Sequence, residues 1–291
     1  MNLIKQLMEA TLCPIDKPAA YGLYHWLFMI ISITLMLTFC ILMRNKSDKT
    51  FRIVMIVIGA VLLGAELYKH LYYAFAYDKE TFNGVPYHGY EWNIVSFQLC
   101  SVPMYLSVAV GCMKKCKVRD ILCEYIVSIG FLGGIMAYIE PSGILHDDLF
   151  CLLHSCIWHG LLIFLALYIL FTNNACQKLR DYPKAIIVFG GVVVVATILN
   201  LCFISKVDEG FNMCYISPFR NTPLAVFKDV TQMLQNLFNE KSSDMLSFGR
   251  LIVNIIYILV VPVGGFIVYS GSYGVKKLVS FIASKSKRSK E

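Results

Sequence analysis

Cys100 and His159 are the residues of this 291-residue chain whose types could carry nucleophilic chemistry. A thiol attacks a carbonyl group as its thiolate, so it needs a base or a cation close by. Cys100 by itself would be an ordinary small apolar residue, but His159 lies at a similar depth in another apolar stretch. The pair predicts acyl transfer or acyl hydrolysis through a thioester, with Cys100 as nucleophile and His159 as base.

Other polar residues within apolar stretches could complete such a site. Acyl transfer needs hydrogen-bond donors for the oxyanion, and Gln98, Asn200 and His154 are candidates. Glu66 or Glu140 could orient a histidine, as the third group of a catalytic triad does. The full set of supporting or cavity-lining candidates is His25, Glu66, His70, Gln98, Glu140, His154, Asn200 and Asn254.

Each supporting residue also has a structural interpretation. Glu66 and Lys69 are three residues apart and could simply pair on one helix face. Amphipathic residues at span ends often anchor a helix at the interface, and asparagines within spans often hydrogen-bond between helices. These alternatives apply to His25 and His70, and to Asn200 and Asn254, respectively.

His154 and His159 lie five residues apart, which separates them by about 140° around a helix. They therefore cannot face the same point. The deeper position of His159 favours it as the functional histidine, with His154 facing a neighbouring helix or the interface.

The elements that carry these residues are transmembrane helices. Apolar residues make up 57% of the chain and charged residues only 15%, which excludes an ordinary soluble domain. Seven stretches reach the roughly 20 residues that span a hydrocarbon core, and only helices satisfy their backbone there. We expect an all-α polytopic bundle with spans at 22–43, 53–71, 94–113, 121–139, 149–171, 185–204 and 251–271.

The distribution of lysine and arginine predicts the orientation. The segments on one side hold 17 basic residues and those on the other side hold 9. Because basic residues accumulate on the cytoplasmic side, we expect the N-terminus outside and the C-terminus inside. The net charge of +7 thus reports topology, and its dispersal argues against a nucleic-acid partner.

The segments outside the spans have separate expectations. Residues 1–21 form an extracytoplasmic segment without the features of a signal peptide. The long outer loop 205–250 contains an amphipathic helix at 223–240, which lies either on the outer leaflet or against the bundle. The tail 272–291 is basic and is expected to lie along anionic headgroups or in solvent.

With this orientation the polar span residues fall in the outer half of the membrane. The inner halves 53–64, 160–171 and 186–196 contain no charged residue, His, Asn or Gln. Polar residues within spans are costly and tend to mark function. The pattern predicts a polar cavity that opens towards the outer side.

Three short motifs resemble the YwaF-type family of bacterial seven-span membrane proteins. They lie at 97–106, with Leu99-Cys100, at 133–141, with Gly133 and Pro141, and at 154–160, with His159-Gly160. A fourth region, around Asn200 and 211–215, looks similar, although Cys214 interrupts the usual Asn-Tyr pair. YwaF-type proteins are similar, more distantly, to eukaryotic multi-pass phospholipid acyltransferases that use a Cys and a His. The resemblance implies a bacterial cytoplasmic membrane protein with Cys100 as nucleophile and His159 as base.

The competing function is a transporter or binding protein for a small molecule or lipid that uses the same cavity. Apolar inner halves and the lack of a visible inverted repeat argue against transport. Histidine spacing gives no helical metal pair, so no metal or other cofactor is expected. The last span lacks the lysine that a retinal protein needs. The expected partners are membrane lipids, with an acyl lipid as substrate, and no oligomeric state follows from the sequence.

Overall fold

The computed structural model describes residues 2–75, 96–205, 211–222, 225–241 and 246–288. Its helices are α1 (Asn2–Glu9), α2 (Leu23–Met43), α3 (Asp48–Phe75), α4 (Val102–Cys112), α5 (Lys117–Tyr125), α6 (Phe131–Ile139), α7 (Leu149–Phe171), α8 (Pro183–Cys202), α9 (Ala225–Leu237) and α10 (Phe248–Arg288). A π-helical turn, η1 (Ile126–Gly130), joins α5 directly to α6. Across the described residues the long elements are all helical, which confirms the predicted fold class.

Six helices are long and apolar enough to cross a membrane: α2, α3, the continuous α5–η1–α6 rod, α7, α8 and α10. Large apolar side chains such as Leu35, Ile187 and Leu259 are exposed on their outer faces. Such apolar side chains on the outside of long helices are suited to contact with lipid chains. α7 begins and ends at the residues predicted for the fifth span.

The predicted third span, 94–113, differs from the structure. The helix α4 begins only at Val102, with Pro103 in its first turn, and its 11 residues reach about 16 Å, half of a hydrocarbon core. Residues 98–101 form a tight turn in which Ser101 and Val102 donate backbone hydrogen bonds to the Gln98 carbonyl. Proline lacks an N–H and is favoured at a helix start, which explains why the helix begins here.

Contacts at the helix ends fix the path of the chain around α4. Arg52, in the first turns of α3, donates to the carbonyls of Gly111 and Cys112 at the end of α4, so the two helices are antiparallel. Arg119, at the start of α5, pairs with Asp48 at the start of α3. Residues 96–119 therefore run along α3 from Glu66, near its end, to Asp48, at its beginning.

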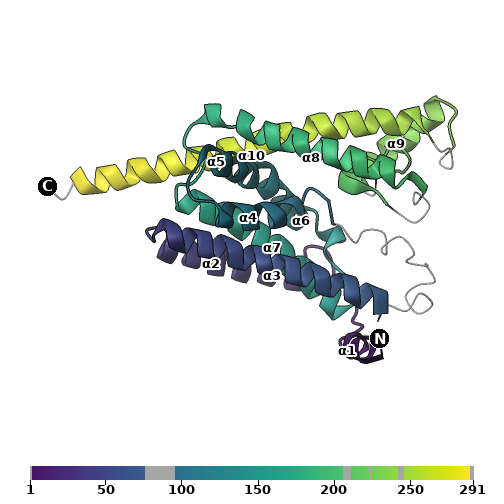
Figure 1. Cartoon of the computed structure of the whole chain (residues 1–291), viewed down its shortest axis with the longest axis horizontal. Coiled ribbons are helices and arrows are strands. Elements are labelled where there is room, and N and C mark those ends of the chain that lie inside the picture. The colour runs from purple at the N-terminus through teal and green to yellow at the C-terminus, as the bar shows by residue number, and fades with distance from the viewer. Residues whose placement is uncertain (1, 76–95, 206–210, 223–224, 242–245, 289–291) are drawn as a thin grey trace.

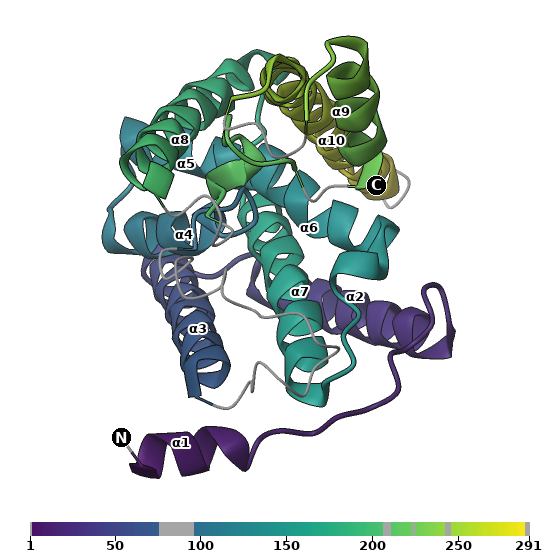
Figure 2. The same cartoon turned by 90° about the vertical axis from the view of Figure 1, so that its right-hand side faces the viewer.

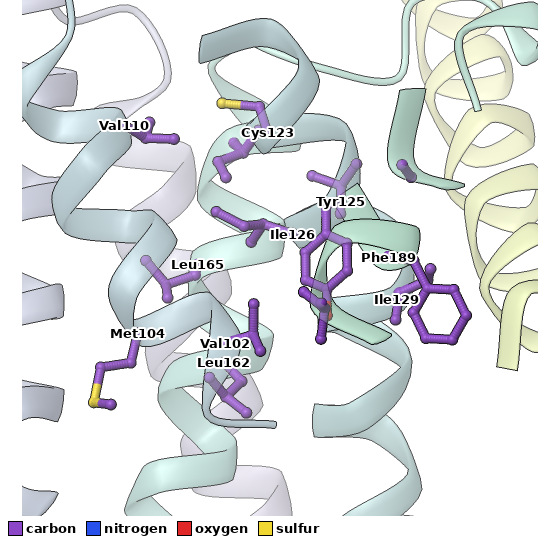
Figure 3. Close-up of a cluster of buried hydrophobic side chains, with 14 of the residues drawn as sticks. Val102, Met104, Val110, Cys123, Tyr125, Ile126, Ile129, Leu162, Leu165 and Phe189 are labelled. Carbon is purple, nitrogen blue, oxygen red and sulfur yellow. The ribbon is translucent and has the colours of Figure 1, made fainter. Parts of the chain in front are cut away.

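The core of the bundle lies where α4, α5, η1, α7 and α8 converge (Figure 3). Its central side chains are Val102, Met104 and Val110 of α4, Cys123 and Tyr125 of α5, Ile126 and Ile129 of η1, Leu162 and Leu165 of α7, and Phe189 of α8. The short helix α4 thus packs against α3, the α5–η1 segment and α7. This packing positions the turn that precedes it.

The C-terminal part of the chain is more helical than predicted. A helix does form within 223–240, as α9, and it packs against α10 through the ring contact of Phe227 with Tyr257. α10 has 41 residues and runs on past the bundle towards the C-terminus (Figure 1). The basic segment from 272 is therefore a continuation of the last helix as far as Arg288, not a separate tail.

The N-terminal segment crosses the beginning of α7. Backbone hydrogen bonds join Ile15 to Asp147 and Leu149 to Cys13, and the Asp148 carboxylate accepts from the Cys13 amide. Figure 2 shows this segment leading from α1 across one end of the bundle to α2. Residues 1–21 are thus ordered against the bundle over the part that the structure describes.

Candidate functional site

Glu66, on α3, is the centre of a buried charged cluster. Its Oε1 lies 2.7 Å from Lys69 Nζ and 3.4 Å from His70 Nε2, and its carboxylate accepts a short hydrogen bond from the Ser96 hydroxyl. Lys69 and His70 follow Glu66 by three and four residues, so one helix face presents all three groups. The predicted Glu66–Lys69 pair is therefore present. Glu66 also binds Ser96, on the segment that leads into α4.

The same cluster includes His154 of α7. Its Nε2 lies 3.8 Å from Glu66 Oε2, its ring stacks on Trp158 with centroids 5.4 Å apart, and Lys69 Nζ lies 5.7 Å from the Trp158 ring centroid. Among the described residues, neither His154 Nε2 nor Glu66 Oε2 has a hydrogen-bond partner. These two buried atoms face each other across a gap too long for a direct hydrogen bond.

Cys100 lies in the turn before α4, four residues after Ser96. The predicted position, within a helical third span, is therefore wrong: Cys100 and Gln98 sit in non-helical backbone that ends at the first turn of a half-length helix.

Two consecutive glycines of α6 bring Cys100 and His159 towards each other. A Cβ on Gly133 would lie 3.8 Å from the Cys100 Cβ, and one on Gly134 would lie 3.3 Å from the His159 carbonyl oxygen. Consecutive residues of a helix point about 100° apart. Gly133 therefore faces the Cys100 turn, and Gly134 packs against α7 beside His159.

His159 is held in one tautomer. Its Nδ1 lies 2.8 Å from the Ser155 carbonyl oxygen, which can only accept, so Nδ1 carries the proton and Nε2 keeps a lone pair. Within the described part of the chain no hydrogen bond joins His159 to Cys100. The histidine thus has the form that a general base requires, although it does not contact the thiol in this state.

The predicted amide residues hold a loop, residues 211–217, beside Cys100. Asn200 of α8 donates to the Met213 carbonyl at 3.1 Å and accepts from the Met213 amide at 2.7 Å. Asn254 of α10 donates to the carbonyls of Ile216 and Ser217. These asparagines therefore bind the backbone of a loop instead of joining two helices directly.

The same loop is joined to the Cys100 turn. Gln98 Nε2 donates to the Asn212 carbonyl at 2.9 Å, while Cys214 donates from its amide and from its sulfur to the Phe97 carbonyl at 3.0 and 3.1 Å. Burial raises the pKa of the Cys214 thiol to about 12. The Asn212 side chain accepts a hydrogen bond from the Ser217 amide. Asn212 therefore stabilises the loop even though Cys214 separates it from Tyr215.

Two predicted residues lie outside this arrangement. His25 is buried among the rings of Tyr21, Trp26 and Tyr138, and neither ring nitrogen has a hydrogen-bond partner among the described residues. Glu140 is exposed and accepts from Ser142 at the end of α6. The structure therefore separates the predicted set into a charged cluster, a loop clamp and these two residues.

A second polar group lies at the other end of the bundle, which corrects the expectation that polar residues share one half. Arg119 is fully buried and donates to Asp48 and to the Asn174 side chain. Glu124 accepts from the Tyr269 hydroxyl at 2.8 Å and from the Cys176 amide at 3.0 Å. Glu124 falls within the predicted fourth span, so its charge was the signal that sequence analysis missed.

No group of three or more His, Cys, Asp or Glu side chains in the described residues is arranged to hold a metal ion.

The helices and the buried polar groups define a multi-pass integral membrane protein. The chain belongs to the TMEM164 family, whose model matches residues 20–238. The match spans α2 to α9, including the Cys100 turn, the charged cluster, and Asn200 with the 211–217 loop; Asn254 lies beyond it. No curated protein and no solved structure matches the chain. This match does not show the resemblance to the YwaF-type family. Similarity to acyltransferases likewise stays a prediction from the motifs.

Proposed function

We propose that this protein is a thiol-dependent lipid acyltransferase or acyl hydrolase with Cys100 as its nucleophile. The observation that carries the proposal is the position of Cys100. It lies in a turn within an apolar bundle, at the N-terminus of a half-length helix. Helix N-termini and nearby cations are the surroundings that turn a thiol into a nucleophile.

In the proposed reaction, His159 Nε2 takes the Cys100 proton and the sulfur attacks the carbonyl carbon of a lipid ester. The tetrahedral intermediate collapses to a thioester as the alcohol leaves with the proton from His159. A second alcohol, or water, then gives its proton to His159, attacks the thioester and restores the thiol. A backbone N–H of the Cys100 turn would serve as the donor for the oxyanion in both steps.

His159 must approach Cys100 for this reaction. Catalytic hydrogen bonds are often long in substrate-free proteins and shorten when substrate binds. Gly133 and Gly134 let α6 pack closely on the Cys100 turn and on α7, which carries His159. The fixed Nδ1 proton already directs the basic nitrogen away from the backbone of α7.

The proposal includes the membrane topology. Because Ser96 binds Glu66 near the end of α3 and the end of α4 binds Arg52 near the beginning of α3, we infer a seventh crossing made by residues 96–112. The basic-residue count places the start of α3 on the cytoplasmic side. The Cys100 turn then lies in the outer half of the bundle, in reach of lipids of the outer leaflet.

Covalent labelling tests the nucleophile. The protein in lipid nanodiscs is treated with an iodoacetamide-type lipid probe, and each cysteine is followed by peptide mass spectrometry. Cys100 should react faster than the other ten, because a thiolate is the reactive form. Cys214 is the matched control, since it lies beside the Cys100 turn but its S–H donates to the Phe97 carbonyl.

Catalysis is tested on the same preparation with a phospholipid and a lysophospholipid acceptor. Wild type should transfer acyl chains and carry a hydroxylamine-sensitive acyl group on Cys100. Cys100→Ser should abolish both signals and His159→Ala should slow labelling, while His154→Ala has a smaller effect. If Cys100 reacts no faster than Cys40 or Cys202, the nucleophile is wrong and the binding or transport function takes precedence.

A further inference from the structure

Ser155, in the second turn of α7, has an unusual hydrogen-bond partner for a hydroxyl in a helix. Its Oγ lies 3.0 Å from Nε2 of His146, on the loop that joins α6 to α7. Helical hydroxyls commonly donate to the carbonyl of the preceding turn. Among the described residues six do so in or at the end of helices: Thr34, Thr38, Ser128, Thr172, Thr197 and Thr231. Ser155 makes no such bond in this part of the chain, so His146 is the group that can accept its proton.

The loop that carries His146 is held on both sides. Ile144 and Leu145, which precede it, are buried in a cluster with side chains of α7. Asp147, which follows it, accepts a backbone hydrogen bond from Ile15 of the N-terminal segment. The imidazole is therefore placed over the beginning of α7 by its neighbours, as a base must be placed before it can act.

The two residues also have the protonation that nucleophilic chemistry requires. Burial lowers the pKa of His146 below its ordinary value, so its ring is neutral at neutral pH. Because Ser155 donates to Nε2, the ring proton lies on Nδ1. A serine hydroxyl bonded to the basic nitrogen of a neutral imidazole is the arrangement that activates serine nucleophiles.

Other charges near the loop also affect this histidine. The positive charges of Lys17 and Lys69 lower the pKa of His146 further, and the negative charges of Asp147 and Asp148 oppose them. The Asp148 carboxylate is already bound by the amides at the start of α7 and on the N-terminal segment. The neutral form of His146 therefore follows from its burial, and the neighbouring carboxylates do not reverse it.

We propose that Ser155 and His146 form a second nucleophilic site, separate from Cys100, that hydrolyses a carboxylic ester. Both residues are partly exposed at the end of the bundle where α7 begins, which gives an ester access to Oγ. His159 is one turn deeper and hydrogen-bonds the Ser155 carbonyl instead of its hydroxyl. The serine thus has a base of its own.

In the first step, Nε2 of His146 takes the Ser155 proton while Oγ bonds to the carbonyl carbon of the ester. The ester C–O bond breaks, and the alcohol leaves with the proton from His146. Water then gives a proton to His146 and attacks the acyl-serine. The carboxylic acid is released, and the proton returns from His146 to Oγ.

Fluorophosphonate labelling tests the nucleophile, because an activated serine displaces fluoride and keeps the phosphonyl group. The full-length protein in lipid nanodiscs is treated with a long-chain alkyl probe or with a short water-soluble one, and peptide mass spectrometry identifies the labelled serine. Ser155 should be labelled, and Ser155→Ala should lose the signal. Faster labelling by the long-chain probe indicates a lipid ester as substrate, and faster labelling by the short probe indicates a water-soluble ester.

The base is tested with His146→Gln, which keeps a hydrogen-bond partner for Ser155 but cannot take its proton. This variant should lower the labelling rate by at least about a hundredfold. The wild-type rate should fall as the pH decreases below about 6.5, since a protonated His146 accepts no proton. Ser142 is the matched control, because it is exposed beyond the other end of the same loop and binds Glu140 instead of a histidine; it should stay unlabelled.

The result does not depend on acyl transfer at Cys100, since Cys100→Ala should still be labelled at Ser155. Folded wild-type protein in which neither probe labels Ser155 would overturn the inference. Labelling that neither His146→Gln nor acid pH slows would also overturn it. In both cases the hydrogen bond of Ser155 with His146 only holds the loop on α7.

Discussion

At the scale of single residues, most of the buried polar side chains near Cys100 have fixed hydrogen-bond partners. Asn200, Asn254 and Gln98 use their amides on backbone groups, and Glu66 gathers partners from three segments. Residue type and depth could predict that these side chains would be polar exceptions in an apolar bundle. The backbone partners of the three amides could not be predicted, because a loop far along the chain, residues 211–217, supplies them.

Glu240 gives a prediction at this scale. It accepts hydrogen bonds from the Ser247 hydroxyl and from the amides of Phe248 and Gly249 at the start of α10. The Ser247 hydrogen bond is the main cause of a pKa below the usual value of this carboxyl. A lowered folded-state pKa means that the stabilisation is present above the ordinary value and is lost as pH falls through the folded one.

Hydrogen exchange checks this expectation. The protection of the Phe248 and Gly249 amides, corrected for intrinsic exchange, should decrease as pH falls below about 4.5, the usual range of glutamate. Glu240→Gln should show the lower protection at all pH values. Equal protection of wild type and variant at neutral pH would mean that the carboxylate does not hold the start of α10.

At the scale of elements, α4 is where sequence and structure differ most. Apolar composition predicted a span over 94–113 and could not show that its first part is a turn. The signals were Pro103 and the polar residues before it, but tight packing against α3 and η1 decides the outcome. By contrast, α7 matches its prediction at both ends because Asp148 caps its first turn and its apolar stretch is uninterrupted.

Two glycines of α3 test that packing. A Cβ on Gly59 would lie 2.5 Å from Ser107 and Val108 of α4, whereas a Cβ on Gly64 meets nothing within 4 Å. Gly59→Ala should therefore lower the free energy of unfolding by about 1–3 kcal/mol. It should also displace α4 and slow the labelling of Cys100.

Gly64→Ala is the matched control on the same helix. It should be neutral or raise the free energy of unfolding by up to about 1 kcal/mol, because alanine favours helix. Denaturant unfolding in detergent, together with the rate of Cys100 labelling, measures both effects. If the two variants behave alike, close contact between α3 and α4 does not position the Cys100 turn.

At the scale of the whole molecule, the two ends of the bundle carry different polar groups. The charged cluster and the Cys100 turn lie towards the end of α3, whereas Arg119 and Glu124 lie towards its beginning. The two ends of the bundle can therefore be told apart, and the basic-residue count predicts which end faces outside. Native cysteines can report this orientation, because Cys13 is exposed at one end of the bundle, and Cys112 and Cys116 are exposed at the other.

A membrane-impermeant maleimide applied to intact cells should therefore modify Cys13 and leave Cys112 and Cys116 untouched until the membrane is permeabilised. Peptide mass spectrometry reads each site, and buried Cys40 controls for unfolding because it should remain unmodified throughout. Cys13 faces out in this prediction because its segment lies across the end of the bundle opposite to the basic loops. Modification of Cys112 and Cys116 in intact cells, with Cys13 protected, would reverse the orientation. Cys100 would then lie in the cytoplasmic half, and its lipid substrate would come from the inner leaflet.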